Sequence, residues 1–188
     1  MKNVRVIFSL LFLLASAHGA RAQSGVPAKP PTASQVIDAW IANTETHLVP
    51  VADAMPEDKY SFAPTNGEFK GVRTFAEQIK HLAANNYRMA AKILGEKPAA
   101  DQESEQGPDS VRTKAEIVAY LSGSFAALHK AVGTIDASNE VALLPGKSGV
   151  WERARLGLAI DAVAHSFDHY GQLVEYLRMN GIVPPDSR

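Results

Sequence analysis

The sequence predicts an all-α protein, a four-helix bundle with long connections. Apolar residues recur at spacings of three and four in four long stretches, as they do on one face of an α-helix. Two of these stretches begin with capping-box sequences, and the strict apolar–polar alternation of half-buried strands is missing. With 188 residues, 46% of them hydrophobic, the chain is long enough for one domain with a sizeable core.

The N-terminal residues have the pattern of a secretory signal peptide. Lys2 and Arg5 precede a largely apolar stretch over residues 6–17, and Ala20-Arg21-Ala22 follows as an A-x-A cleavage site. A membrane-spanning helix needs about 20 apolar residues, so this stretch is too short for an anchor. We therefore expect cleavage after Ala22 and export to the periplasm. The expected division is a signal peptide over 1–22, a flexible Pro-rich spacer over 23–33 and the helical domain over 34–188.

Charge and cysteine content exclude several classes of function. Without the three basic residues of the signal peptide, 16 basic residues remain beside 20 acidic ones, a net charge of −4 over 166 residues. A nucleic-acid-binding surface needs a basic excess, so no nucleic-acid partner is expected. No later stretch is apolar for long enough to insert into a membrane. The chain has no cysteine, which excludes disulfides, a Cys nucleophile and thiolate metal ligands.

The first helix is expected over residues 34–55. Pro50 should kink this helix or end it early, because proline lacks a backbone donor and clashes with the preceding turn. A long connection over residues 55–71 follows. The apolar residues of the predicted helix are Ile37, Trp40, Ile41, Leu48, Val51 and Met55.

Capping boxes mark the start of the next two helices. Thr74 with Glu77 predicts a second helix that continues to Leu94 and ends at Gly95. The acidic, Pro- and Gly-punctuated residues 96–112 predict a solvated loop.

Thr113 with Glu116 predicts a third helix to about Val132. The fourth helix is expected over residues 150–180, with Gly181 as its cap.

The fourth predicted helix carries two inward stripes, so we expect it to pack against neighbours on both. One stripe comprises Leu156, Ile160, Val163, Phe167, Tyr170, Val174 and Leu177. The second comprises Leu158, Ala162, His165, His169, Leu173 and Tyr176. A buried polar ring without a partner costs roughly 1–3 kcal/mol, so the two histidines need a partner there.

These histidines suggest a metal site. His165 and His169 are four residues apart, so both imidazoles reach one ion from the same helix face. A third ligand must come from another helix, and His81 is the best candidate because it lies in mid-helix on a polar line with Gln78 and Asn85. Hydrogen-bonded core histidines are the alternative interpretation. The remaining histidines of the helical domain, His47 and His129, are expected at the surface near helix ends.

Other metal and catalytic motifs are missing. The sequence contains no H-E-x-x-H and no E-x-x-H, which argues against zincin and di-iron carboxylate sites. It also lacks the phosphate-binding glycine loops and the G-x-S-x-G elbow. With no thiolate available, a metal site here must be built from nitrogen and oxygen ligands.

Three stretches resemble the DinB-like (DinB/YfiT-type) four-helix-bundle superfamily: MPEDKYSFAPT at residues 55–65, TFAEQIKHLA at 74–83 and HSFDHYGQLVEYLRMNGIVPP at 165–185. Together with the order of helices, the resemblance covers nearly all of the chain after the signal peptide. It implies that His81, His165 and His169 ligate one divalent ion, zinc or nickel. It also implies a homodimer that associates through helix faces.

The resemblance leaves several functions open. Characterised members of the superfamily include S-transferases and an isomerase that use low-molecular-weight thiols. Such thiols are cytoplasmic, so for an exported protein we favour metal-assisted hydrolysis of a small molecule. No general acid or base can be named, because Asp161 and Asp168 are expected to point sideways from the ligands. One alternative is a non-catalytic metal-binding bundle. The other is a haem-binding bundle that uses one histidine and Met55, which the histidine trio disfavours.

Overall fold

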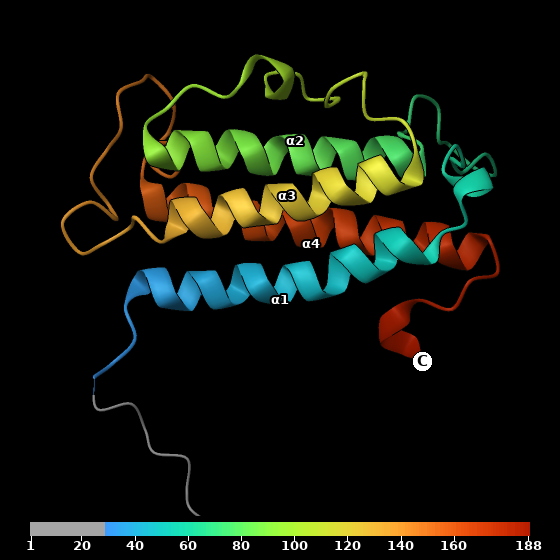
Figure 1. The fold of residues 1–188 in the computed structure, drawn as a ribbon, viewed down its shortest axis with the longest axis horizontal. Coiled ribbons are helices and arrows are strands. Elements are labelled where there is room, and N and C mark those ends of the chain that lie inside the picture. The colour runs from blue at the N-terminus through green and yellow to red at the C-terminus, as the bar shows by residue number, and fades with distance from the viewer. Residues whose placement is uncertain (1–28) are drawn as a thin grey trace, which may run out of the picture. The chain divides into compact units, whose positions relative to one another are not determined.

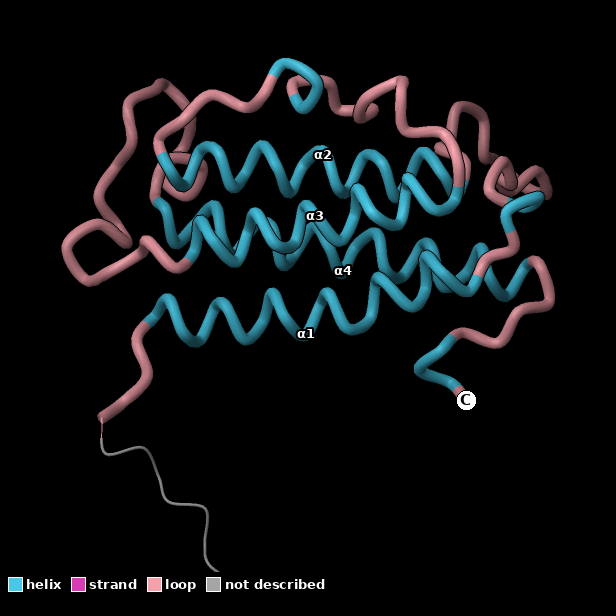
Figure 2. The backbone as a smooth tube through the Cα atoms, viewed as in Figure 1, coloured by secondary structure: helices cyan, strands magenta, loops and turns pink. Residues whose placement is uncertain are grey.

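The computed structural model describes residues 29–188, of which residues 31–188 form one compact unit. Its four α-helices are α1 (Ala33–Ala54), α2 (Phe75–Leu94), α3 (Lys114–Val132) and α4 (Arg155–Met179). Three short 3₁₀ helices lie in the connections and at the C-terminus: η1 (Glu57–Lys59), η2 (Ala100–Gln102) and η3 (Pro185–Ser187). Residues 29–188 contain no β-strand (Figure 2), which confirms the predicted all-α class. The predicted signal peptide lies outside the described residues.

The helices form a four-cornered bundle. α1 packs against α3 and α4, and α2 packs against the same two helices. Figure 1 shows that α1 and α4 run in one direction while α2 and α3 run in the other. Because α2 and α3 are parallel, residues 95–113 must return along the length of the bundle before α3 begins. This crossover, which carries η2, lies beside α2 and supplies a group to the site described below.

The two predicted capping boxes are confirmed. The hydroxyl of Thr74 accepts a hydrogen bond from the Glu77 backbone N–H, and the Glu77 carboxylate accepts one from the Thr74 N–H. Thr113 and Glu116 make the same reciprocal pair at the start of α3. At the end of α2, Gly95 adopts the left-handed conformation typical of a glycine cap, with φ of 74°.

α1 begins with a capping box that was not among the predicted ones, between Thr32 and Gln35. The helix continues past Pro50 to Ala54, so proline does not end it. Figure 1 shows α1 bending in its C-terminal half. A bend there is the expected response to a missing donor and a bulky ring inside a helix.

The predicted start of the fourth helix is wrong by five residues, because α4 begins only at Arg155. The turn before α4 is held by an isolated antiparallel bridge between Ala154 and Leu143 of the 133–149 connection. Beside this bridge, the Leu144 N–H donates to the Arg153 carbonyl at 2.8 Å. The turn also lies directly against the helix. A Cβ at Gly157 would overlap the carbonyl oxygen of Trp151, so only glycine permits this approach.

Of the two predicted stripes on α4, the second is the buried one. Apart from the half-buried His165, its members are all buried. The first stripe is buried only toward its C-terminal end, whereas Ile160 is 52% exposed. Trp40 on α1, predicted to be apolar core, is 51% exposed. Ile160 and Trp40 line the same surface groove along the α1–α4 contact.

Candidate metal centre

Three imidazole rings from two helices meet between α2 and α4. His81 comes from the middle of α2, and His165 and His169 come from adjacent turns of α4. Nε2 of His165 lies 3.3 Å from Nε2 of His81 and 3.1 Å from Nε2 of His169. One nitrogen from each ring lies within 4.8 Å of the other two. Among the described residues no other group of histidines and carboxylates is arranged in this way.

The spacing of these nitrogens fits one metal ion. Metal–nitrogen distances of about 2.0–2.1 Å in a tetrahedral site place the ligand nitrogens about 3.3 Å apart. The two Nε2–Nε2 distances, 3.3 and 3.1 Å, agree with that separation. Imidazole nitrogen is a good ligand for zinc, copper, iron and nickel. The residues present therefore fit a divalent transition-metal ion and could hold one.

Neighbouring groups set the orientation of two of the rings. Nδ1 of His81 donates to the backbone carbonyl of Glu105 at 2.9 Å, which leaves the Nε2 lone pair free to face the other histidines. The Asn85 amide lies 3.2 Å from Nδ1 of His165. Because the amide oxygen of Asn85 accepts a hydrogen bond from Arg88, its NH2 group faces Nδ1 of His165. Nδ1 of His169 is buried and has no hydrogen-bond partner among the described residues.

All three histidines are held in the neutral form. Burial lowers the pKa of His165 to about 4, with a further contribution from the charge of His81. Burial and the two neighbouring rings lower the pKa of His169 to about 3. Burial also lowers the pKa of His81, although its bond to the Glu105 carbonyl acts in the opposite direction. Neutral imidazole is the form that binds metal, so at pH 7 no proton has to be displaced.

A polar layer lies one helical turn from the histidines. Nε2 of Gln78 donates to Oε1 of Gln172 at 2.7 Å across the α2–α4 contact, and Gln172 donates in turn to Asp168. Gln78 and Asn85, predicted as part of a polar line on the second helix, thus both face α4. Asp168 is exposed and, of the residues in this layer, bonds only to Gln172.

Two arginines lie near the three rings. The positive charges of Arg73 and Arg88 both act to lower the pKa values of His81 and His165. Arg88 donates to the Asn85 amide oxygen at 3.2 Å and lies 3.9 Å from the Glu105 carboxylate. Sequence reasoning missed these residues. Arg88 follows His81 by seven residues and so shares its helix face, but Glu105 acts through its backbone and leaves no side-chain signal.

The other candidate residues lie elsewhere. His129 is placed between the carboxylates of Asp38 and Glu45 and links α3 to α1. His47 is partly exposed and packs against the Tyr170 ring at 5.5 Å. His129 lies near the end of α3, as expected, whereas His47 lies about two turns before the end of α1; both are partly buried, and neither joins the group. Met55, the second ligand of the haem hypothesis, is fully buried in the core at the end of α1. α1 is not among the close neighbours of α2, the helix that carries His81.

The sequence profile of the DinB superfamily matches residues 41–173, which is more than half of the chain. The chain belongs to the DinB superfamily. The matched region of this DinB-superfamily chain contains all of α2 and α3 and the three histidines. Among curated proteins, none matches the sequence. Within the described residues, none of the helices combines the length and apolarity needed to span a bilayer.

Proposed function

We propose that this protein is an exported, metal-dependent hydrolase of a small molecule. One divalent ion, zinc or nickel, would be held by His81, His165 and His169. The observation that carries the proposal is the convergence of three neutral imidazoles, with no carboxylate among them. Three neutral ligands leave the charge of the ion undiminished and a coordination position open, as in catalytic zinc sites. An ion held there would supply Lewis acidity and would make water more acidic near neutral pH.

The surrounding residues orient the ligands and stabilise negative charge. The Glu105 carbonyl and the Asn85 amide hold the rings of His81 and His165. Arg73 and Arg88 add positive potential, which stabilises the negative charge that develops during hydrolysis of a carbonyl substrate. His165 is the least buried of the three histidines, so a substrate would approach from its side.

A non-catalytic role for the metal is the second candidate. His81 and His169 are only 8% and 5% exposed, and the trio joins α2 to α4 across the bundle. An ion in this position would cross-link two helices whose histidines are 84 residues apart in sequence. Its contribution would then be to the stability of the fold, because a ligand that binds only the folded state stabilises it.

Metal analysis beside activity separates these roles. The chain is purified without a histidine tag, and metal is quantified in wild type, His169→Ala and His129→Ala. We expect about one ion per chain in wild type and in the His129→Ala control, and little in His169→Ala.

The same proteins are then assayed on chromogenic esters and amides, with and without a low-molecular-weight thiol. Hydrolysis that disappears on chelation and returns with zinc supports the hydrolase. Activity only with thiol supports an S-transferase, and thermal stabilisation without activity supports the structural role. A metal-free wild-type protein contradicts all three.

Export is proposed from the leader pattern alone. Mass spectrometry of the protein from a periplasmic extract should show a chain that begins at Gln23. A full-length chain confined to the cytoplasm would contradict it.

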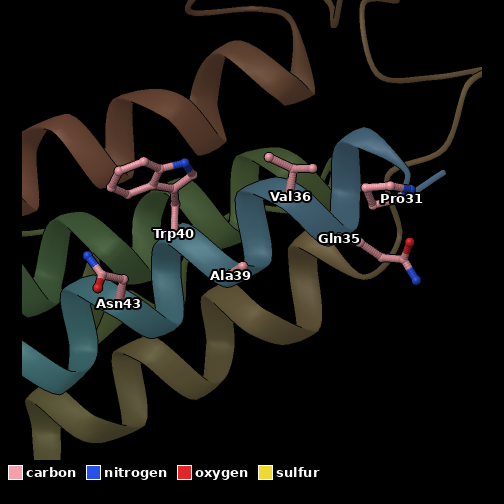
Figure 3. A pocket seen from close by; sticks show the side chains of 6 residues that line it. All are labelled: Pro31, Gln35, Val36, Ala39, Trp40 and Asn43. Carbon is pink, nitrogen blue, oxygen red and sulfur yellow. The ribbon is translucent and has the colours of Figure 1, made fainter. Parts of the chain in front are cut away.

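We also propose a homodimer. Supporting it, Figure 3 shows Val36 and Trp40 along the outer side of α1. These two side chains are 48% and 51% exposed, and Trp40 continues into an apolar groove with Ile160 and Phe167 of α4. An exposed apolar face on a pair of helices suits a self-complementary contact around a two-fold axis.

A further inference from the structure

A groove with walls of opposite charge leads away from the three histidines along the α2–α4 contact. Its volume is about 430 Å³, within the range of small-molecule sites. We call it the α2–α4 groove and define it by Asn85, Arg88, Lys92, Trp151, Glu152 and Asp161. Its near end is Asn85, whose amide touches His165. A molecule in the groove would therefore lie next to the ring of the most exposed candidate ligand.

The two walls carry opposite charges. Arg88 and Lys92, one turn apart on α2, form the cationic wall, and Arg88 lies 3.9 Å from the carboxylate of Glu105, which also lines the groove. Asp161 lies one turn before His165 on α4, and Glu152 lies in the turn that precedes the helix. Asp161, which was expected to point sideways from the ligands, lines this groove and is half-buried.

Although Arg88 faces the Glu105 carboxylate, the charged side chains of the described residues form no ion pair between the two walls. Among the ion pairs of the described residues, none includes Lys92, Glu152 or Asp161. Burial raises the pKa of Asp161, and Lys92 and Glu152 act on it in opposite directions. The groove thus holds a separated positive and negative wall, and the charges of a dipolar ligand would complement both.

Trp151 lies at the far end of the groove and is held there by the backbone. Its side chain is 55% exposed, while its carbonyl oxygen lies against Gly157 of α4. Arg155 ties the same region to the end of α2, because its Nε donates to the Ile93 carbonyl at 2.9 Å. An aromatic face beside two carboxylates provides a favourable place for an ammonium group.

We propose that the α2–α4 groove binds a dipeptide in its zwitterionic form, with its C-terminal carboxylate on Lys92 and Arg88 and its N-terminal ammonium group between Asp161, Glu152 and Trp151. Asn85 then lies between the bound dipeptide and His165. The proposal rests on the proposed metal-dependent function, since it names the class of substrate that this site takes. Binding itself needs only the groove, so the two can be tested separately.

The probe is L-alanyl-L-alanine, and the reporter is Trp151. The chain has two tryptophans, so Trp40→Phe leaves Trp151 as the only one. Fluorescence titrations compare the dipeptide with its N-acetyl form, which lacks the ammonium group, and with its C-terminal amide, which lacks the carboxylate. We expect saturable binding of the dipeptide and at least about tenfold weaker binding of both capped forms, since each loses a charge-assisted hydrogen bond.

Variants assign the two ends. Lys92→Met should weaken binding of the dipeptide about tenfold and leave binding of the C-terminal amide unchanged. Asp161→Asn should also weaken binding of the dipeptide about tenfold, but it should leave binding of the N-acetyl form unchanged. Lys130→Met, an exposed lysine of α3, is the matched control and should bind as wild type. Equal binding of all three probes, or no saturable binding to folded protein, overturns the proposal.

A third variant separates this proposal from the metal site. Binding that persists in His169→Ala supports the groove and also excludes chelation of the ion by the dipeptide as the source of the signal. If the signal disappears in His169→Ala, the dipeptide was bound by the ion and the groove proposal is wrong, while the metal proposal stands. If wild type contains no metal and still discriminates among the probes, only the metal proposal fails.

Discussion

The backbone carbonyl of Glu105 accepts a hydrogen bond from Nδ1 of His81, although Glu105 belongs to the crossover between α2 and α3. The contact exists because the parallel arrangement of α2 and α3 sends this crossover back along the bundle. It fixes the tautomer of a buried histidine and turns its other nitrogen toward α4. A loop that looks merely solvated in the sequence thus takes part in building the site.

The metal-free protein should lose stability below about pH 6.5. The pKa values of His165 and His169 in the folded state, about 4 and about 3, are below the ordinary value of 6.5. The unfolded chain therefore binds protons first as the pH falls, which favours unfolding. Between pH 7 and pH 5 we expect a loss of about 2 kcal/mol, a value reduced for the solvent screening of partly exposed rings.

Urea unfolding with a chelator present, at a series of pH values, measures this loss. The double variant His165→Asn/His169→Asn removes both groups, and its stability should change far less over the same range. An equal slope in wild type and variant would show that other groups control the acid sensitivity.

Removal of the Asn85 side chain should weaken metal binding. Asn85→Ala deletes the group that contacts Nδ1 of His165, and the loss of such a support typically costs about tenfold or more in affinity. Competition with a fluorescent chelator gives the affinity. Asn86→Ala is the control, because Asn86 is also buried on α2 but bonds to Ser124 of α3. The prediction is wrong if both variants lose affinity equally.

Two glycines of α4 should respond in opposite ways to alanine. In Gly157→Ala the new Cβ would collide with the Trp151 carbonyl, so the turn must move and the free energy of unfolding should fall by about 1–3 kcal/mol. At Gly171 a Cβ meets nothing within 4 Å, and alanine should stabilise the helix by about 1 kcal/mol. Thermal unfolding gives both signs, and a changed Trp151 emission in Gly157→Ala, in a Trp40→Phe background, reports the displaced turn.

The proposed dimer should depend on Trp40. Trp40→Glu places a charge in the exposed apolar face of α1, and we expect it to convert a dimer to a monomer in analytical ultracentrifugation. Val141→Glu is the control, since Val141 is also exposed but lies in the connection between α3 and α4. A wild-type protein that sediments as a monomer at high concentration contradicts the dimer.

Local interactions explain why much of the fold was predictable. The capping boxes at Thr74 and Thr113 bond groups only three residues apart, so their sequence is sufficient to place the helix starts. The one start that was missed, at Arg155, depends on pairing with the 133–149 connection and on the Trp151–Gly157 contact. Those partners are not visible in a helical pattern.

The sequence by itself determined the four helices and the pair of histidines one turn apart, because helix periodicity and spacing are properties of a few neighbouring residues. It also marked His81 as the candidate for the third ring. Only the tertiary structure decided that His81 reaches His165, that a crossover carbonyl orients it and that Asp161 lines a groove beside it. Each of these contacts joins residues of different elements, and their distances are set by how α2 packs on α4.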